Sequence, residues 1–110
     1  MDERAERIGL NEALYRDVNE RVKAINESFG GRLEEAEFVC ECGDIDCADR
    51  VRMKLGEYES LRAEPTHFAV KAGHEIPDVE EVVRTHEEYV VVAKNPGRGA
   101  KVARETDPRS

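Results

Sequence analysis

Three cysteines lie within eight consecutive residues, and their spacing constrains the fold of this chain more than any other feature. Cys40, Cys42 and Cys47 form a C-x-C-x4-C pattern. In an extended strand successive side chains point to opposite faces, so Cys40 and Cys42 should project from the same face. Gly43 is expected to take a positive φ in a tight turn that returns the chain to Cys47. The three sulfurs should therefore face one point.

Three thiolates that converge need a fourth ligand to complete a metal site. His74 is the best candidate among the three histidines, because residues 72–77 read as a turn between expected strands, where a side chain can be aimed inward. His67 is the runner-up. Three thiolates and one imidazole are typical of structural zinc. The predicted ligands of Zn²⁺ are Cys40, Cys42, Cys47 and His74.

Three other roles for the cysteines remain open at this point. They could be small apolar residues of a core, since free cysteine is often buried. A disulfide fits less well, because one thiol would be left over and neighbours along one extended strand pair badly. An iron–sulfur cluster is a further alternative, although the spacing matches neither ferredoxin pattern.

The composition indicates one small domain with a thin hydrophobic core. The chain has 110 residues, of which 38% are charged and 5% aromatic, and it has no tryptophan. Zinc binding by finger peptides contributes about 10–16 kcal/mol, which is comparable with the whole stability of an ordinary domain. A metal ion would therefore supply much of the stability that the core lacks.

The charge and the apolar pattern limit the partners that we expect. A net charge of -8 repels phosphate backbones, so we do not expect general nucleic-acid binding. No apolar run approaches the roughly 20 residues of a membrane span, and the amino terminus lacks the apolar centre of a secretory signal. We therefore expect a cytoplasmic protein with reduced or metal-bound thiols.

Residues 1–30 are expected to form an amphipathic helix that stops at Gly30-Gly31. Its seam, at alternating spacings of three and four, consists of Ile8, Asn11, Tyr15, Val18, Val22, Ile25 and Phe29. Two hypotheses follow: the seam packs on the rest of the chain or on a second copy, or it docks a different protein. The predicted partner-binding residues are Ile8, Tyr15, Val18, Val22 and Ile25.

Residues 31–96 are expected to form a zinc-bearing α+β domain, and residues 97–110 a flexible tail. The pattern predicts a strand pair around the cysteine loop, a short helix over 56–63, a strand over 66–70, and a hairpin that turns near His86. The fold class is therefore α+β: a long amino-terminal helix followed by a small antiparallel sheet with a short helix, joined by the zinc site.

These motifs together resemble those of a group of short bacterial proteins of unassigned function. The resemblance rests on Phe38 to Gly43 with Cys47, on Gly73-His74-Glu75, and on the strand from Tyr89 to Lys94. It implies that the three cysteines and His74 form one site that binds zinc. It implies no substrate.

The sequence favours a binding module over an enzyme. Four protein ligands leave no open position on zinc for water, and no additional base is evident for a cysteine nucleophile. The first hypothesis is a structural-zinc module that contacts another protein. The alternative is a thiol-based redox or metal-sensing switch. The third is weak nucleic-acid binding through the short basic stripe of Arg50, Arg52 and Lys54.

Overall fold

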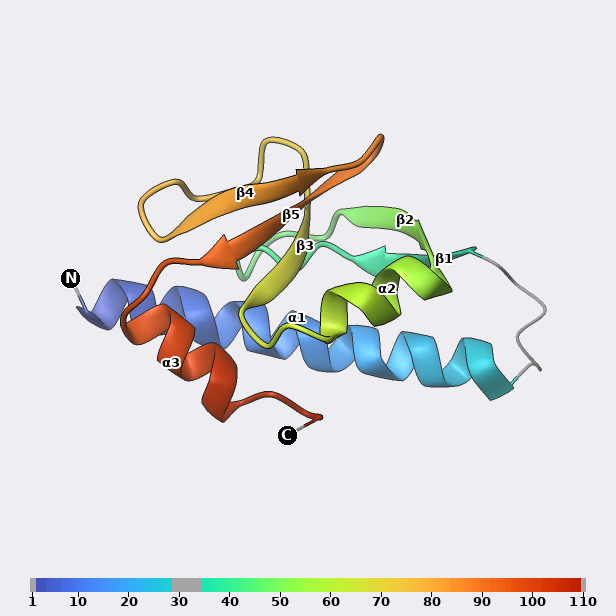
Figure 1. Ribbon diagram of the computed structural model, residues 1–110, viewed down its shortest axis with the longest axis horizontal. Coiled ribbons are helices and arrows are strands. Elements are labelled where there is room, and N and C mark those ends of the chain that lie inside the picture. Colours follow the sequence, from blue (N-terminus) through green and yellow to red (C-terminus); the bar gives the residue numbers. More distant parts are fainter. Residues whose placement is uncertain (1, 29–34, 110) are drawn as a thin grey trace.

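The chain folds as an α+β structure in which one long helix lies beneath two small antiparallel sheets (Figure 1). The computed structural model describes residues 2–28 and 35–109. Its elements in chain order are α1 (Asp2–Ser28), β1 (Glu35–Val39), β2 (Arg50–Lys54), α2 (Leu55–Arg62), β3 (His67–Lys71), β4 (Glu80–Thr85), β5 (Tyr89–Lys94) and α3 (Arg98–Glu105). The predicted fold class is confirmed.

The strands pair as the local pattern predicts, but they form two sheets. β1 pairs with β2, and β5 lies between β3 and β4. The predicted strand pair around the cysteine loop and the predicted hairpin near His86 are both confirmed. The sheets are separate because regular pairing of β1 ends at Val39, and the next residues cross over to β3: Glu41 N–H donates to the carbonyl of Ala69 at 2.8 Å.

Two hydrophobic clusters fill the interior. In the first, between the β1–β2 pair and α2, the rings of Phe38 and Tyr58 stack with their centroids 4.5 Å apart. The second lies on the other side of β3 and β5, and its members are Cys40, Cys42, Phe68, Val70, Val90, Val92 and Ala103. The first two cysteines are therefore buried at the edge of this second cluster.

The face of α1 that packs on the domain is largely polar. Glu12, Arg16 and Asn19 are fully buried along it. The predicted apolar seam therefore has the wrong phase: Ile8 and Val22 do turn inward, whereas Val18 and Ile25 are exposed. The helix turns this polar face inward because the polar groups on it form hydrogen bonds and ion pairs with the rest of the domain. Phe29 and the predicted stop at Gly30-Gly31 lie outside the described residues.

The prediction of a flexible tail over 97–110 is wrong for most of that segment. Residues 98–105 form α3, which packs on α1 and buries Ala100, Val102 and Ala103. Gly9 permits this close packing, since a Cβ there would stand 3.3 Å from the Val102 side chain. Ala100 and Ala103, which are three apart, were the signal in the sequence for a packed helix here.

Candidate metal centre

The structure brings together the four residues that the sequence predicts as ligands. The ligand atoms of Cys40, Cys42, Cys47 and His74 all lie within 4.8 Å of one another. His74 Nδ1 is 3.6 Å from the Sγ atom of Cys40 and 3.6 Å from that of Cys47. All three cysteines are free of disulfide bonds. The distant histidine thus faces the cysteine cluster.

The two equal distances suit a tetrahedral metal ion. With a Zn–S distance of about 2.3 Å and a Zn–N distance of about 2.0–2.1 Å, a tetrahedral site separates nitrogen from sulfur by about 3.6 Å. The observed separations from Nδ1 to Cys40 Sγ and Cys47 Sγ match this value. The donor set and its spacing therefore fit zinc.

Cys40 and Cys42 are positioned by a segment that links the two sheets. Cys40 N–H donates to the carbonyl of Asp49 at 3.0 Å, and Glu41 N–H donates to Ala69 on β3. Lys71 N–H in turn donates to Cys40 Sγ at 3.2 Å. The prediction that the cysteines lie within a strand is corrected, because β1 ends at Val39. Backbone hydrogen bonds of Cys40 and Glu41 nevertheless hold this segment to the Asp49 side and to β3.

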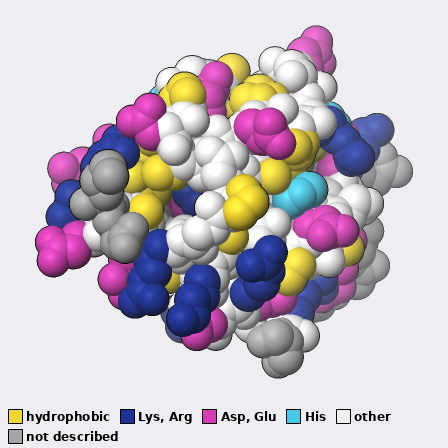
Figure 2. Space-filling model, turned by 60° about the vertical axis from the view of Figure 1, so that its left-hand side comes forward, with side chains coloured by type: hydrophobic (Ala, Val, Ile, Leu, Met, Phe, Trp, Pro, Cys, Tyr) yellow, Lys and Arg dark blue, Asp and Glu magenta, His cyan; other side chains and the backbone are white. Residues whose placement is uncertain are grey.

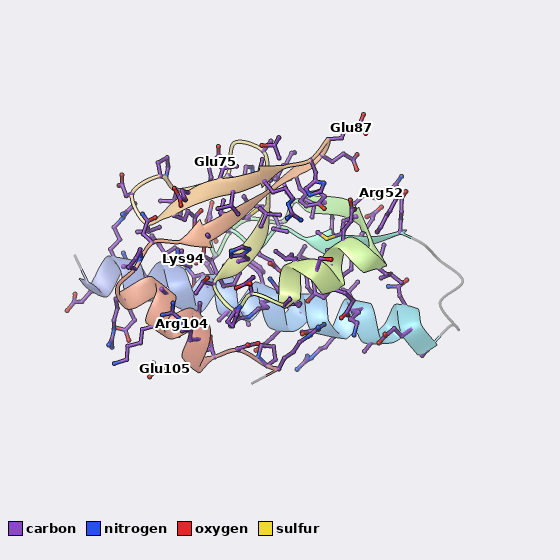
Figure 3. All side chains as sticks on the ribbon, viewed as in Figure 1. Arg52, Glu75, Glu87, Lys94, Arg104 and Glu105 are labelled. Carbon is purple, nitrogen blue, oxygen red and sulfur yellow. The ribbon has the colours of Figure 1, made fainter. Side chains whose placement is uncertain are left out.

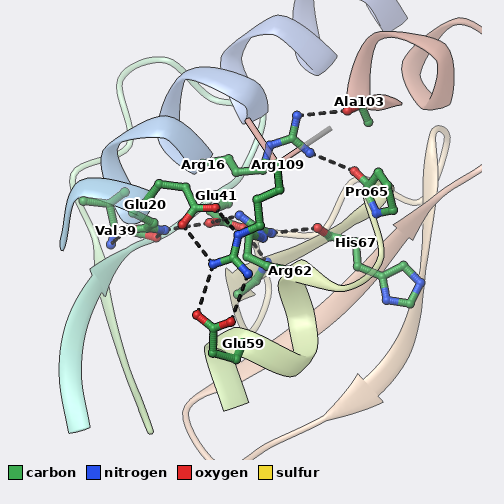
Figure 4. A network of polar contacts seen from close by, with 12 residues as sticks. Arg16, Glu20, Val39, Glu41, Glu59, Arg62, Pro65, His67, Ala103 and Arg109 are labelled. Atoms are coloured by element: carbon green, nitrogen blue, oxygen red, sulfur yellow. Dashed lines mark hydrogen bonds and ion pairs between the residues drawn. The ribbon is translucent and has the colours of Figure 1, made fainter. Parts of the chain in front are cut away.

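Glu41, between two of the ligands, points away from the metal site into the protein. Its carboxylate is 0% exposed and accepts two hydrogen bonds from Arg62, one from Asn19 Nδ2 at 2.7 Å and one from Ala69 N–H (Figure 4). Four hydrogen bonds on one carboxylate fix the segment that carries Cys40 and Cys42.

Arg16 connects α1 to α3 through further hydrogen bonds next to this network. Arg16 donates to the carbonyls of Pro65 and Ala103, and its guanidinium lies 5.0 Å from the ring centroid of Phe68 (Figure 4). The Arg62 guanidinium lies 5.7 Å from the same centroid. The guanidinium groups of two buried arginines thus both contact the ring of Phe68, which packs in the same hydrophobic cluster as Cys40 and Cys42.

The loop to Cys47 packs directly on α1. Gly43 does not take the positive φ that we expected, since among the described glycines only Gly73 and Gly97 do. It is needed for a different reason: a Cβ at this position would stand 2.5 Å from Ile8 Cγ2. Asn11 Nδ2 donates to the Gly43 carbonyl at 2.8 Å. Close approach to the helix therefore explains the glycine.

Tyr15 holds the rest of this loop from the helix side. Its hydroxyl lies within hydrogen-bond distance of the carbonyls of Asp44, Ile45 and Cys47, at 3.2, 2.8 and 3.0 Å. Tyr15 was predicted to bind a partner, but the described structure gives it this internal contact. α1 thus orients the cysteine loop.

His74 is aimed by a turn and by a carboxylate. Gly73 precedes it with φ of 94°, and His74 N–H donates to the Lys71 carbonyl at 2.9 Å. On the far side of the ring, His74 Nε2 lies 3.3 Å from Asp49 Oδ2. A proton on Nε2 that is shared with Asp49 leaves Nδ1 free to bind a metal, the arrangement common for ligating histidines.

The thiols have unequal acidities when only protein atoms surround them. A hydrogen bond from Cys40 lowers the pKa of Cys42 to about 5. The same contact, together with burial, raises the pKa of Cys40, and burial raises the pKa of Cys47. Negative charge therefore collects first on Cys42, and a divalent cation would draw the remaining thiols toward thiolate.

A buried charged triad anchors the loop that carries His74. Lys94 Nζ lies 2.9 Å from Glu12 Oε1 and 3.1 Å from Glu80 Oε1, with all three side chains inaccessible to solvent. Glu80 Oε2 also accepts the N–H of Ile76 at 2.9 Å. Figure 3 shows Lys94 at the end of β5. Burial raises the pKa of Glu12 well above its usual range.

His67, the runner-up ligand, does not belong to the metal group. It opens β3 and lines a separate hollow of about 700 Å³ between α2 and the β4–β5 hairpin. Burial lowers its pKa.

A smaller hollow of about 240 Å³ lies beside the metal group, lined by Cys42, Asp44, Gly73, His74 and Ile76. Small molecules can therefore approach the site from one side.

The basic stripe on β2 lies opposite acidic residues. Glu35 and Glu37 on β1 stand across from Lys54 and Arg52 in the strand register, and Arg52 pairs with Glu37 at 3.7 Å. The face shown in Figure 2 likewise mixes acidic, basic and hydrophobic side chains. The stripe is therefore partly neutralised within the protein.

No protein-family model matches the chain, and no curated protein or solved structure is significantly similar to it. Within the part of the chain that the structure describes, no helix is both long and apolar enough to cross a membrane.

Proposed function

We propose that this chain is a small zinc-binding protein in which Cys40, Cys42, Cys47 and His74 hold one structural Zn²⁺. The observation that carries the proposal is the position of His74 Nδ1, 3.6 Å from two of the three sulfurs and opposite a carboxylate that orients the ring. The ion would join three stretches of chain that follow β1, precede β2 and follow β3.

We further propose a non-catalytic role as a protein-interaction or regulatory module in the cytoplasm. Four protein ligands complete a tetrahedral shell, and such a shell has no position for an activated water. Exposed apolar residues on α1 support a role in protein contacts.

A redox or metal-sensing switch is the second candidate, and the hollow beside the ligands favours it. A peroxide that entered there could oxidise two thiolates to a disulfide, with its own reduction to water or hydroxide and release of the ion. Nucleic-acid binding, the third hypothesis, gains little support, because the basic stripe faces Glu35 and Glu37.

Elemental analysis of the purified protein tests the zinc proposal. We expect about one zinc per chain, which corresponds to one four-ligand structural site. His74→Ala and Cys47→Ser should each lose most of it. His67→Ala is the matched control and should keep it. A metal-free wild type, or equal zinc content in His74→Ala and in the control, would refute the proposal.

Peroxide treatment of the zinc-loaded protein separates the two roles. If the protein is a switch, zinc release should rise together with the loss of free thiols, and each disulfide that forms should consume two thiols. A purely structural site should keep its zinc when peroxide is present at concentrations that oxidise small thiols.

A further inference from the structure

A groove of about 700 Å³, the hollow that His67 lines, lies between α2 and β4. β5 forms its floor through Tyr89 and Val91, α2 forms one wall through Leu61, and Val83 of β4 forms part of the other. Pockets that bind small molecules typically have volumes of about 300–1,000 Å³. The groove is therefore large enough for a small organic ligand.

The groove exists because α2 covers only part of the sheet that it packs on. Leu61 of α2 belongs to one hydrophobic cluster with Ala69 of β3 and Val91 of β5, and the described members of that cluster include no residue of β4. β4 is an edge strand of this sheet. Arg84 of β4 pairs with Val91 in the strand register, which places both side chains on the face that α2 partly covers. β4 therefore extends this face beyond the helix.

Arg84 supplies the groove with a cation that has no partner within the protein. It is the one lysine or arginine among the described lining residues, and its side chain forms no hydrogen bond or ion pair with another described residue. Its charge acts inside the groove: burial is the main cause that lowers the pKa of His67, and the charges of Arg84 and Arg62 lower it further. A guanidinium binds a carboxylate through two parallel hydrogen bonds.

The two acidic residues that line the groove leave this cation available. Glu57 is engaged within the protein, because its Oε1 accepts the N–H of Lys54 at 3.0 Å and its Oε2 lies 3.5 Å from His86 Nδ1. Glu64 follows the end of α2 and is exposed, so water and salt screen its charge. Arg84, by contrast, stands beside the floor residue Val91 in the strand register.

His67 adds a neutral hydrogen-bond donor to the same groove. Its carbonyl accepts a hydrogen bond from Arg62 Nη2 at 2.8 Å, and its ring extends away from that buried network (Figure 4). Because burial lowers its pKa, the ring is mostly neutral near neutral pH and carries one N–H. The lining therefore combines donors for an anion with an apolar floor.

We infer that the groove binds a small organic carboxylate, with its anionic head on Arg84 and His67 and its apolar body against Val83 and the floor. This inference goes beyond the proposed function, because the groove shares no lining residue with the hollow beside the metal group. One ion pair in a site open to water contributes little affinity, so the groove should recognise a class of ligands and bind each member weakly.

An NMR titration of the isotope-labelled, zinc-loaded full chain tests the site. The probes are phenylbutyrate and phenylbutylamine, which share one apolar body and carry opposite charges. Phenylbutyrate should shift the amide signals of Val83, Arg84 and Val91 in a saturable way. Phenylbutylamine should leave the same signals unchanged at equal concentration.

Substitutions in the groove test the two halves of the ligand separately. Arg84→Gln should weaken phenylbutyrate binding at least about ten-fold, because the charge-assisted hydrogen bonds are lost. Val83→Glu should also weaken it, since it places a negative charge on the apolar wall. Arg104→Gln, at an exposed position of α3, is the control for the first change. Val82→Glu is the control for the second, because Val82 pairs with Val92 and faces the other side of the sheet. The amide spectrum of each variant shows whether it is folded.

Several results would overturn the inference. They are a wild type without saturable shifts, equal binding of the amine and the carboxylate, and equal affinities of Arg84→Gln and Arg104→Gln. Inorganic phosphate that bound as tightly as phenylbutyrate would overturn it too, because the apolar floor would then contribute nothing.

Zinc content measured on the same samples keeps the two proposals distinguishable. A zinc-loaded protein that binds no probe overturns the carboxylate site and leaves the metal site standing. A zinc-free protein that binds phenylbutyrate in the groove supports the carboxylate site and refutes the metal site alone.

Discussion

At the scale of single residues, the metal site depends on side chains that are not ligands. Glu41 is the clearest case, because it lies between two ligands, faces the other way and neutralises Arg62 in the interior. Breaking a buried ion pair leaves one charge without compensation, which costs far more than the pair itself contributes.

We therefore predict that Glu41→Gln destabilises the zinc-loaded protein by about 3–5 kcal/mol, because Arg62 keeps its charge and loses its partner. Urea denaturation followed by circular dichroism measures the change. Glu37→Gln, at an exposed position of β1, is the control and should change stability by no more than about 0.5 kcal/mol. Equal effects of the two substitutions would show that the buried pair is unimportant.

The second residue-scale prediction concerns the carboxylate behind His74. Asp49→Ala should weaken zinc binding by about 10–100-fold, because Nε2 loses the group that fixes the ring and its tautomer. Competition with a coloured chelator gives the affinity. Asp46→Ala removes a nearby exposed carboxylate from the same loop and should leave the affinity close to that of the wild type.

At the scale of elements, α1 is joined to the cysteine loop by close packing as well as by hydrogen bonds. Gly43→Ala should destabilise the protein by about 1–3 kcal/mol, because the new methyl group overlaps Ile8. The cost should shrink in an Ile8→Ala background, which a double-mutant cycle measures. Gly56→Ala, in open space on α2, is the control and should be neutral or slightly stabilising. Additive effects of Gly43→Ala and Ile8→Ala would contradict this contact.

The triad that joins α1 to β4 and β5 gives a prediction about pH. Burial raises the pKa of Glu12 in the folded protein. The folded state therefore binds a proton more tightly than the unfolded state, and this contribution is full below the unfolded pKa and lost as pH rises through the folded value. Glu12→Gln should remove that loss, so its free energy of unfolding should improve relative to the wild type as pH rises. If the difference in free energy of unfolding between Glu12→Gln and the wild type stayed constant as pH rises, this account would be contradicted.

The sequence predicted the elements well and the helix orientation poorly, for physical reasons. The alternation in β2, the cysteine spacing and the turn at Gly73-His74 are local signals, and the structure bears out each of them. The phase of α1 is not local: Glu12, Arg16 and Asn19 turn inward only because Lys94, Glu41 and backbone carbonyls meet them there. Partners that lie 20 or more residues away leave no periodic signal, and charged residues are usually exposed.

At the scale of the whole molecule, two modest hydrophobic clusters and several buried ion pairs surround the proposed zinc site. Removal of zinc should lower the midpoint of thermal unfolding sharply, because structural zinc contributes about 10–16 kcal/mol against a typical stability of about 5–15 kcal/mol. Differential scanning calorimetry with and without a chelator checks this. His74→Ala is the control, since a chelator should not change its midpoint further.

X-ray absorption spectroscopy at the zinc edge of the purified wild type tests the central claim most directly. The account predicts a first shell of three sulfur atoms at about 2.3 Å and one nitrogen atom at about 2.0–2.1 Å. A shell of four sulfurs, or one made of oxygen and nitrogen atoms without sulfur, would contradict it.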